Sequence, residues 1–289
     1  MRLNLRDSFN ILQLQNCILN VAKYIHDFCE ENGIKYCLMG GSALGAIRHE
    51  GFIPWDDDLD IFMRPDDYEQ FRKLFIRKGD KDNFYLQEWG ESDGMVTLAK
   101  LRMNNTFLLE KDLAEKEMHH GVFVDIFILH NCPKNKMKRL WQYAWAKYLV
   151  TKGAANRNLS KSGLLGFLIK FCRLFPKRFM LNFALKQVYR FNREQSDYYC
   201  HFLGRARMKN GLYKKEYFED YINVPFETIE LKVNNRIKDY LTDRWGDYMK
   251  LPSQEEVKKF QHSWKWSDSL NFIGFNPQAI YPYERFLIS

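Results

Sequence analysis

An acidic run that turns apolar constrains this chain more than any other feature. Residues 53–62 read IPWDDDLDIF. Alternate side chains of a β-strand share a face, so we expect a strand from Asp58 to Met63, with Asp56, Asp58 and Asp60 pointing the same way. Clustered carboxylates repel one another and lose solvation when buried, and a hard divalent cation such as Mg²⁺ or Mn²⁺ relieves both effects. The run therefore predicts a metal site for phosphate chemistry. A solvated acidic turn is the simpler alternative.

A glycine-containing turn precedes the acidic run. Gly40, Gly41 and Ser42 follow a predicted buried strand, Lys35 to Met39, and we expect Ser42 to cap a helix that runs to about His49. Glycine lets the backbone approach a ligand closely, and the amides at the start of a helix favour phosphate. The glycines alone would also fit a plain turn. Together with the acidic strand, they predict a phosphate cradle beside a metal site.

A third carboxylate lies in a second apolar segment. The sequence predicts a strand from Gly121 to Leu129, and Asp125 interrupts its apolar residues. A buried charge needs an ionic partner or a metal. We expect Asp125 to lie beside Asp58 and Asp60 on an adjacent strand. A salt bridge to a nearby Arg or Lys is the structural alternative.

Three basic residues are candidates for phosphate binding. Lys100 and Arg102 are two positions apart on a predicted strand, Val96 to Met103, and therefore share a face. Arg102 could bind phosphate oxygens in the bidentate manner of guanidinium groups. A solvated strand face would explain both residues without a ligand. Arg48 ends the predicted helix after Ser42, where it could reach the anion or cap that helix.

The pattern of apolar residues predicts an α+β fold. Apolar residues at three- and four-residue spacing predict a helix from Ile11 to Glu31, and Pro65 is expected to begin another that runs to about Ile76. Strands and helices alternate at short spacing through residues 1–132, so we expect a nucleotidyltransferase-like mixed sheet with helices packed on it. Residues 133–289 are predicted to form a mainly helical, basic region that packs on this core and completes the substrate site.

Composition indicates a folded, basic protein without an obvious export signal. The 289 residues include 46% hydrophobic residues and have a formal net charge of +8, which favours anionic partners without choosing among them. The cysteines form no CxxC pair, and the first residues lack the apolar core of a signal peptide. No apolar run reaches the roughly 20 residues that span a bilayer. The expected location is cytoplasmic.

The motifs resemble the signature of the LicD family, which includes bacterial phosphocholine transferases and is related to the fukutin-type ribitol-phosphate transferases. The resemblance covers Cys37 to Asp60, continues over Gly121 to Phe127, and returns over Tyr240 to Pro252 and at His262. The middle of the chain is unmatched. Residues 128–130 also differ from the proline and acidic residue that the family pattern would place after Phe127.

This resemblance implies a nucleotidyltransferase-type fold and the transfer of a phospho-alcohol, such as phosphocholine, from a CDP-linked donor to a cell-surface glycan precursor. It implies Mg²⁺ (or Mn²⁺) bound by Asp58, Asp60 and Asp125, with Asp56 as a further ligand. Asp125 could instead accept the proton of the acceptor hydroxyl. The residues expected to bind substrate or phosphate are Gly40, Gly41, Ser42, Arg48, Lys100, Arg102 and His262.

Two other functions remain open from the sequence. A nucleotidylyltransferase would use the same core motif to move a nucleoside monophosphate to a small molecule or a protein. A non-enzymatic nucleic-acid-binding protein would explain the basic charge, although the chain has no recognisable RNA- or DNA-binding module, so no nucleic-acid partner is expected. The stretch from Leu164 to Phe179 mixes apolar and basic residues. It could lie peripherally on the inner face of the membrane, near a lipid-linked glycan acceptor, or form a core helix with a basic solvated side.

Overall fold

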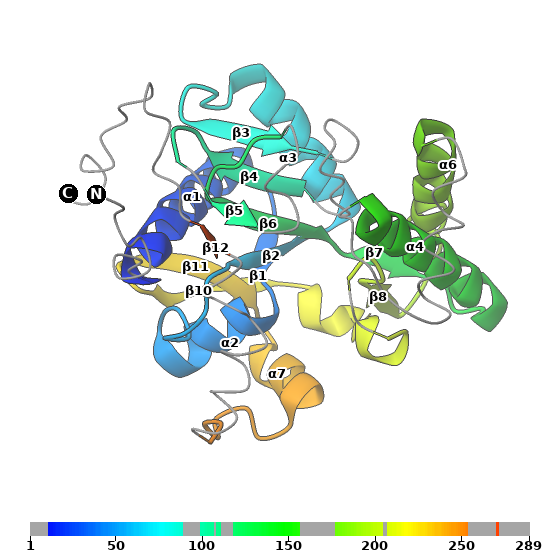
Figure 1. The fold of residues 1–289 in the computed structure, drawn as a ribbon. Coiled ribbons are helices and arrows are strands. Elements are labelled where there is room, and N and C mark those ends of the chain that lie inside the picture. Colours follow the sequence, from blue (N-terminus) through cyan, green and yellow to red (C-terminus); the bar gives the residue numbers. More distant parts are fainter. Residues whose placement is uncertain are drawn as a thin grey trace.

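The computed structural model describes residues 11–88, 99–106, 108–110, 118–156, 177–204, 207–253 and 270–271. Its centre is a five-stranded mixed sheet in the order β1-β2-β6-β4-β3 (Figure 1). β2 and β6 are parallel, and the other neighbouring pairs are antiparallel. The predicted mixed sheet is therefore confirmed. The strands are β1 (Tyr36–Leu38), β2 (Asp60–Met63), β3 (Phe84–Gln87), β4 (Ala99–Met103) and β6 (Phe123–Ile128).

Three N-terminal helices pack on this sheet. The apolar face of α1 (Ile11–Asn32) covers β4 and β6, and α2 (Gly40–His49) lies against β1 and β2. Gly33 follows α1 with a φ of 63°, a left-handed conformation that glycine adopts without strain. α3 (Pro65–Lys78) begins with the expected proline. It has acidic residues in its first turn and basic residues in its last turn. This charge order suits the helix dipole, so local sequence specifies where α3 begins and ends.

A C-terminal hairpin joins the same core from the far end of the chain. β10 (Tyr221–Phe226) and β11 (Ile229–Asn234) pair in antiparallel fashion, and α7 (Ile237–Trp245) follows them. β11 lies beside β1, where the Lys232 amide donates a hydrogen bond to the Tyr36 hydroxyl at 3.4 Å. Phe226, Val233 and Leu241 are buried in the cluster that also includes the sheet residues. The core around the sheet thus includes residues from both ends of the sequence.

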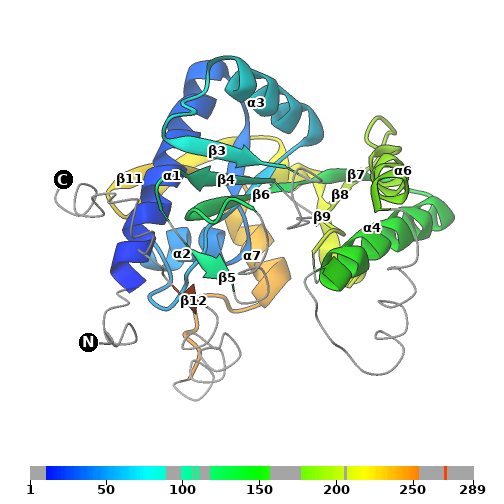
Figure 2. The same ribbon diagram turned by 45° about the horizontal axis from the view of Figure 1, so that its top comes forward.

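A second, smaller core lies to one side of the sheet. There α4 (Lys136–Asn156) packs on α6 (Lys177–Tyr189) and against a small sheet of β7 (His130–Cys132), β8 (Tyr198–Cys200) and β9 (Leu212–Lys214). Figures 1 and 2 show these elements together, away from α1. Short elements complete the described structure: η3 (Lys209–Gly211), η4 (Lys215–Phe218) and the paired β5 (Leu109–Glu110) and β12 (Leu270–Asn271).

The region after residue 133 therefore contains more strand than the sequence predicted. Where a mainly helical region was predicted, β10 and β11 form a hairpin, and the helix that follows, α7, begins only at Ile237. Residues 164–176 of the predicted basic helical segment lie outside the described residues. No helix in the described part of the chain is long and apolar enough to cross a bilayer.

Candidate metal and phosphate site

A polar row crosses the central sheet. Asp60 of β2 pairs in register with Asp125 of β6, Asp125 with Lys100 of β4, and Lys100 with Gln87 of β3. Side chains at paired positions of neighbouring strands point to the same face, so these four groups lie side by side. Asp125 therefore lies next to Asp60 on the adjacent parallel strand, the arrangement expected from the sequence.

Lys100 makes the ionic contact that the sequence offered as the structural alternative for Asp125. Its Nζ lies 2.6 Å from Oδ1 of Asp125, and both side chains are largely buried. The ammonium group also lies over the Phe123 ring, 3.3 Å from the centroid. One positive charge thus faces at least two carboxylates. The salt bridge and the carboxylate cluster coexist, and Lys100 offsets only part of the negative charge.

The acidic run itself is a bend and not a strand. β2 begins at Asp60, so the predicted strand from Asp58 is wrong at its start. The Asp56 amide donates to the Ile53 carbonyl at 2.8 Å, and the Gln15 side chain of α1 donates to the Asp56 carbonyl at 2.9 Å. This bend places one carboxylate oxygen each of Asp56, Asp57 and Asp58 within 4.8 Å of one another. Sequence alternation missed Asp57, because it assumed an extended backbone here.

Burial and mutual repulsion leave these carboxylates short of positive charge. Burial, then the charges of Asp58 and Asp57, raises the pKa of Asp56 from 3.8 to about 8. Burial and Asp125 raise the pKa of Asp58 to about 6, although Lys100 lowers it. The pKa of Asp60 is well above its usual value for the same reasons, desolvation first and then Asp58 and Asp125. A cluster of carboxylate oxygens in this state fits a hard divalent cation, which would replace the retained protons.

The start of α2 lies against the acidic bend. α2 begins at Gly40, so Ser42 does not cap it as predicted, and its hydroxyl instead accepts a hydrogen bond from the Asp60 amide at 2.9 Å. Gly40 has a φ of 55°, a left-handed conformation that glycine adopts without strain. A Cβ added to Gly41 would lie 3.1 Å from Oδ2 of Asp56. Glycine at position 41 therefore leaves room for the acidic bend beside the first turn of α2, where the positive end of the helix dipole favours anions.

The C-terminal segment completes the surroundings of α2. The buried Tyr240 hydroxyl accepts a hydrogen bond from the Gly40 amide at 3.1 Å. Arg48 donates from Nη1 to the Tyr248 carbonyl at 3.1 Å, so it joins α2 to this segment. Arg244 donates to the Tyr213 hydroxyl at 2.9 Å. Burial lowers the pKa of Arg244, but the nearby Tyr213, Tyr240 and Asp60 raise it overall. Arg244 was not among the predicted site residues, although it lies within the C-terminal motif.

Two other predicted site residues are Arg102, which is buried in the protein, and His262. Arg102 shares the face of Lys100, since both cations lie over the Phe123 ring. It is buried and donates to Oε1 of Gln87 and to the Gly121 carbonyl, both at 2.7 Å. These contacts place Arg102 inside the sheet layer. His262 lies outside the described residues.

The turn of the β10–β11 hairpin forms hydrogen bonds with the loop before the acidic bend. Oε1 of Glu227 accepts a hydrogen bond from the Phe52 amide at 2.9 Å, and the Glu227 amide donates to the Glu50 carbonyl at 2.6 Å. A Cβ on Gly51 would lie 2.1 Å from Oε1 of Glu227, so any larger residue there would displace the Glu227 side chain. The hairpin therefore fixes the path of the chain from α2 to the carboxylates.

Comparisons with known proteins agree with this geometry. The family model described as LicD/FKTN/FKRP, nucleotidyltransferase domain, matches residues 33–169. The lipopolysaccharide cholinephosphotransferase LicD of Haemophilus influenzae is 30% identical over 255 residues, which cover 83% of this chain and 91% of that protein. The chain belongs to the LicD family. A segment of 53 residues is 46% identical to the ribitol 5-phosphate transferase FKRP of human and mouse, and it covers 18% of this chain and 11% of that protein.

Proposed function

We propose that this chain transfers a phospho-alcohol, such as phosphocholine, from a CDP-linked donor to a hydroxyl of a cell-surface glycan precursor. The observation that supports this most is the pairing of Asp60 with Asp125 beside the acidic bend and the start of α2. The two named relatives act on phospho-alcohols, since one is called a cholinephosphotransferase and the other a ribitol 5-phosphate transferase. The mixed sheet and the family model support a nucleotidyltransferase-like fold.

A divalent ion, Mg²⁺ or Mn²⁺, fits the carboxylate cluster. Asp58, Asp60 and Asp125 are the residues that we expect to bind it, with Asp56 and Asp57 as further oxygen donors from the bend. Such an ion neutralises charge on the phosphates of a diphosphate donor and helps the leaving phosphate to depart. The raised pKa values of Asp56 and Asp58 support this assignment, because they indicate carboxylates whose charge is not fully compensated.

The residues around the carboxylate cluster would provide anion binding and positioning. The dipole of α2 favours the donor phosphates, and the closeness of Gly41 to Asp56 brings the start of this helix beside the carboxylates. Although burial lowers the pKa of Arg244, the Asp60 charge helps to raise it overall, so this arginine adds positive charge near the cluster. Arg48 joins α2 to the segment that follows α7. Lys100 holds Asp125 in place through its 2.6 Å contact. Asp125 can then either contribute to metal binding or accept the proton of the acceptor hydroxyl.

Product analysis separates this function from a nucleotidylyltransferase. The purified protein with Mg²⁺ would be offered CDP-choline and other CDP-alcohols together with a glycan panel, and the products weighed by mass spectrometry. We expect the acceptor to gain the phospho-alcohol and free CMP to appear. An acceptor that gained the nucleoside monophosphate would establish the alternative. Salt-sensitive binding to nucleic acid without any transfer would favour the nucleic-acid-binding hypothesis.

A further inference from the structure

A cavity lined by charged and aromatic residues lies between the main sheet and the smaller core. It has a volume of about 760 Å³ and is lined by the start of α3, the end of α6, and residues of β7 and β8. Arg64, which follows β2 directly, belongs to its wall. Asp60 lies at the opposite end of β2. At about 3.3 Å per residue, four steps along the strand separate Asp60 from Arg64 by roughly 13 Å, so this cavity is distinct from the carboxylate cluster.

The cavity wall has an excess of positive charge. Its five basic residues are Arg64, Arg72, Arg190, Arg193 and Lys215, and its three acidic residues are Asp66, Glu69 and Glu88. Arg64 is paired with Asp67, and Arg72 with Glu88, each at 2.7 Å. Among the residues that the structure describes, Arg190, Arg193 and Lys215 form no ion pair. Three cations of the lining therefore remain available to an anion, and two of them are arginines, whose planar guanidinium groups suit phosphate or carboxylate oxygens.

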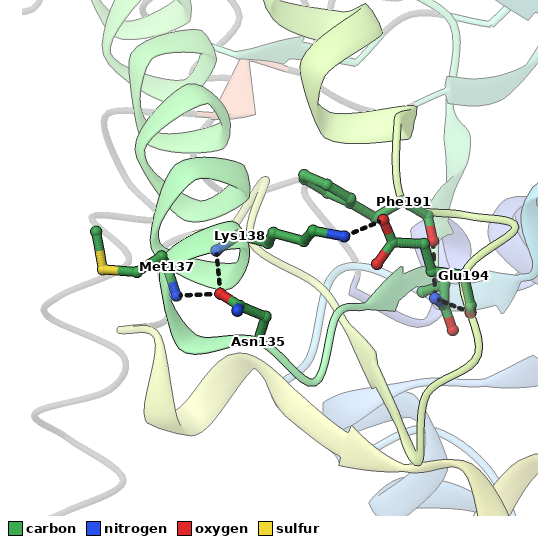
Figure 3. A network of polar contacts seen from close by, with 6 residues as sticks. Asn135, Met137, Lys138, Phe191 and Glu194 are labelled. Atoms are coloured by element: carbon green, nitrogen blue, oxygen red, sulfur yellow. Dashed lines mark hydrogen bonds and ion pairs between the residues drawn. The ribbon is translucent and has the colours of Figure 1, made fainter.

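The turn that presents Arg190 and Arg193 is held rigidly. The buried Asn131 side chain donates to the carbonyls of Phe191 at 2.8 Å and Glu194 at 2.7 Å. The Lys138 ammonium group of α4 lies 2.8 Å from Oε1 of Glu194 (Figure 3). Oδ1 of Asn135 accepts from the first amides of α4, which fixes the helix that positions Lys138 (Figure 3). Binding an anion here would cost little backbone ordering, because the turn is already in place.

The other side chains of the cavity suit a sugar. Tyr189 and Tyr199 contribute aromatic rings with polar ends, and Asn192 contributes an amide, whereas the Tyr68 hydroxyl is bonded to Glu88 and the Asn131 amide to the turn. Rings of this kind pack on the apolar face of a sugar ring, while amides and hydroxyls meet its hydroxyl groups. Lys215 lies over the Tyr199 ring, 4.9 Å from its centroid, so a charge and a stacking surface occur together.

We propose that this cavity binds an anionic part of the acceptor glycan, a saccharide unit with a phosphate or carboxylate group. The inference rests on the proposed function, because that function requires an extended glycan acceptor. The separation of the cavity from the carboxylate cluster suits an oligosaccharide, since its reacting hydroxyl can lie near Asp60 while another sugar unit occupies the cavity. Arg190 and Arg193 determine acceptor affinity and take no part in the chemistry.

Direct binding tests the cavity independently of transfer. Glucose 6-phosphate, glucose and inorganic phosphate would be titrated into the full chain and into the double variant Arg190→Ser/Arg193→Ser, with binding followed by calorimetry. The matched control is Arg77→Ser/Lys78→Ser, which removes the same charge from the exposed end of α3. We expect glucose 6-phosphate to bind the parent and the control more tightly than glucose or phosphate, and at least tenfold more weakly to the double variant.

A kinetic comparison then tests the link to the acceptor. In the double variant, KM for the acceptor glycan should rise at least tenfold, while kcat and the affinity for CDP-choline stay unchanged. Equal binding of glucose 6-phosphate to parent and double variant would overturn the assignment of the site. Binding of inorganic phosphate as tight as that of the sugar phosphate would overturn the saccharide assignment. Binding with an unchanged acceptor KM would show a site for free sugar phosphates instead. A chain that binds glucose 6-phosphate as expected but transfers nothing would contradict the proposed function alone.

Discussion

The metal-free protein should lose stability as the pH rises from 7 to 8. In the folded state the pKa of Asp56 is about 8 instead of 3.8, so this carboxyl retains a proton that the unfolded chain has already released. The folded state binds more protons in this window, and its stability therefore falls as the pH rises. Each fully retained proton contributes about 1.4 kcal/mol per pH unit, and for a chain of this size each kcal/mol shifts Tm by about 2 °C. Asp60, whose pKa is also raised, adds to the same slope.

Histidines define the useful pH window. Burial lowers the pKa of His130 to about 4 and that of His201 to about 3. The unfolded chain protonates these groups below about 6.5, where the folded chain does not, so stability falls as the pH drops through that range. Their effect has the opposite sign to that of the aspartates and is nearly complete by pH 7. Measurements between pH 7 and 8 therefore report mainly on the carboxylate cluster.

Thermal unfolding with and without Mg²⁺ is the assay. In EDTA we expect Tm to fall by about 3 °C between pH 7 and 8 for each retained proton, and Asp56→Asn should flatten this slope. Mg²⁺ at about one hundred times its Kd should add about 2.7 kcal/mol, with a larger gain at pH 8 because fewer protons must leave. A Tm in EDTA that is constant or rises between pH 7 and 8, together with no response to Mg²⁺ or Mn²⁺, would refute the reasoning.

Three further predictions concern the surroundings of the site. Gly41→Ala should leave the free energy of unfolding within about 1 kcal/mol of the parent, because alanine suits a helix. It should weaken Mn²⁺ binding, because the added Cβ would lie 3.1 Å from Oδ2 of Asp56. Unchanged Mn²⁺ affinity by calorimetry would count against this contact. Glu227→Ala should destabilise the chain by about 1–3 kcal/mol in urea unfolding, since the Phe52 amide loses a charged acceptor. Glu227→Gln keeps an acceptor and should lower the free energy of unfolding by less. Equal losses of stability in both variants would contradict the role of this hydrogen bond. Liposome flotation should show binding that rises with the fraction of anionic lipid, because each nearby basic residue contributes about 1 kcal/mol. Binding should fall when four basic residues are replaced by Ser, namely Lys170, Arg173, Lys177 and Arg178. A protein that does not bind anionic liposomes would exclude the membrane contact.

Local patterns predicted much of the N-terminal half. The apolar spacing of α1 and the proline and charge order of α3 depend only on neighbouring residues, and both helices are observed close to the expected bounds. The adjacency of Asp60 and Asp125 was also expected, because two apolar strands with acidic residues and a shared ligand favour one sheet. Their roles in metal binding remain predictions.

Features that depend on long-range contacts could not be read from the sequence. The path of the acidic bend is set by Gln15 of α1, and the loop before it by Glu227, which is 175 residues away from its partner Phe52. Ser42 looked like a helix cap because its type suits that position, but the strand that follows α2 uses its hydroxyl instead. Gln87 entered the polar row through strand register alone. Local propensity does not contain these choices, because packing between distant segments makes them.

The rate of phospho-alcohol transfer by Asp60→Asn tests the central claim most directly. The substitution keeps the size of the side chain and removes one charge from the paired carboxylates of β2 and β6. With CDP-choline, a glycan acceptor and Mg²⁺, we expect transfer by the variant to fall at least about a hundredfold. Its Tm in EDTA should stay equal to or above that of the parent, because asparagine is neutral without the cost of holding a proton on a buried carboxylate. Near-parental transfer by a folded Asp60→Asn protein would contradict the account, since it would show that the reaction does not depend on the carboxylate cluster.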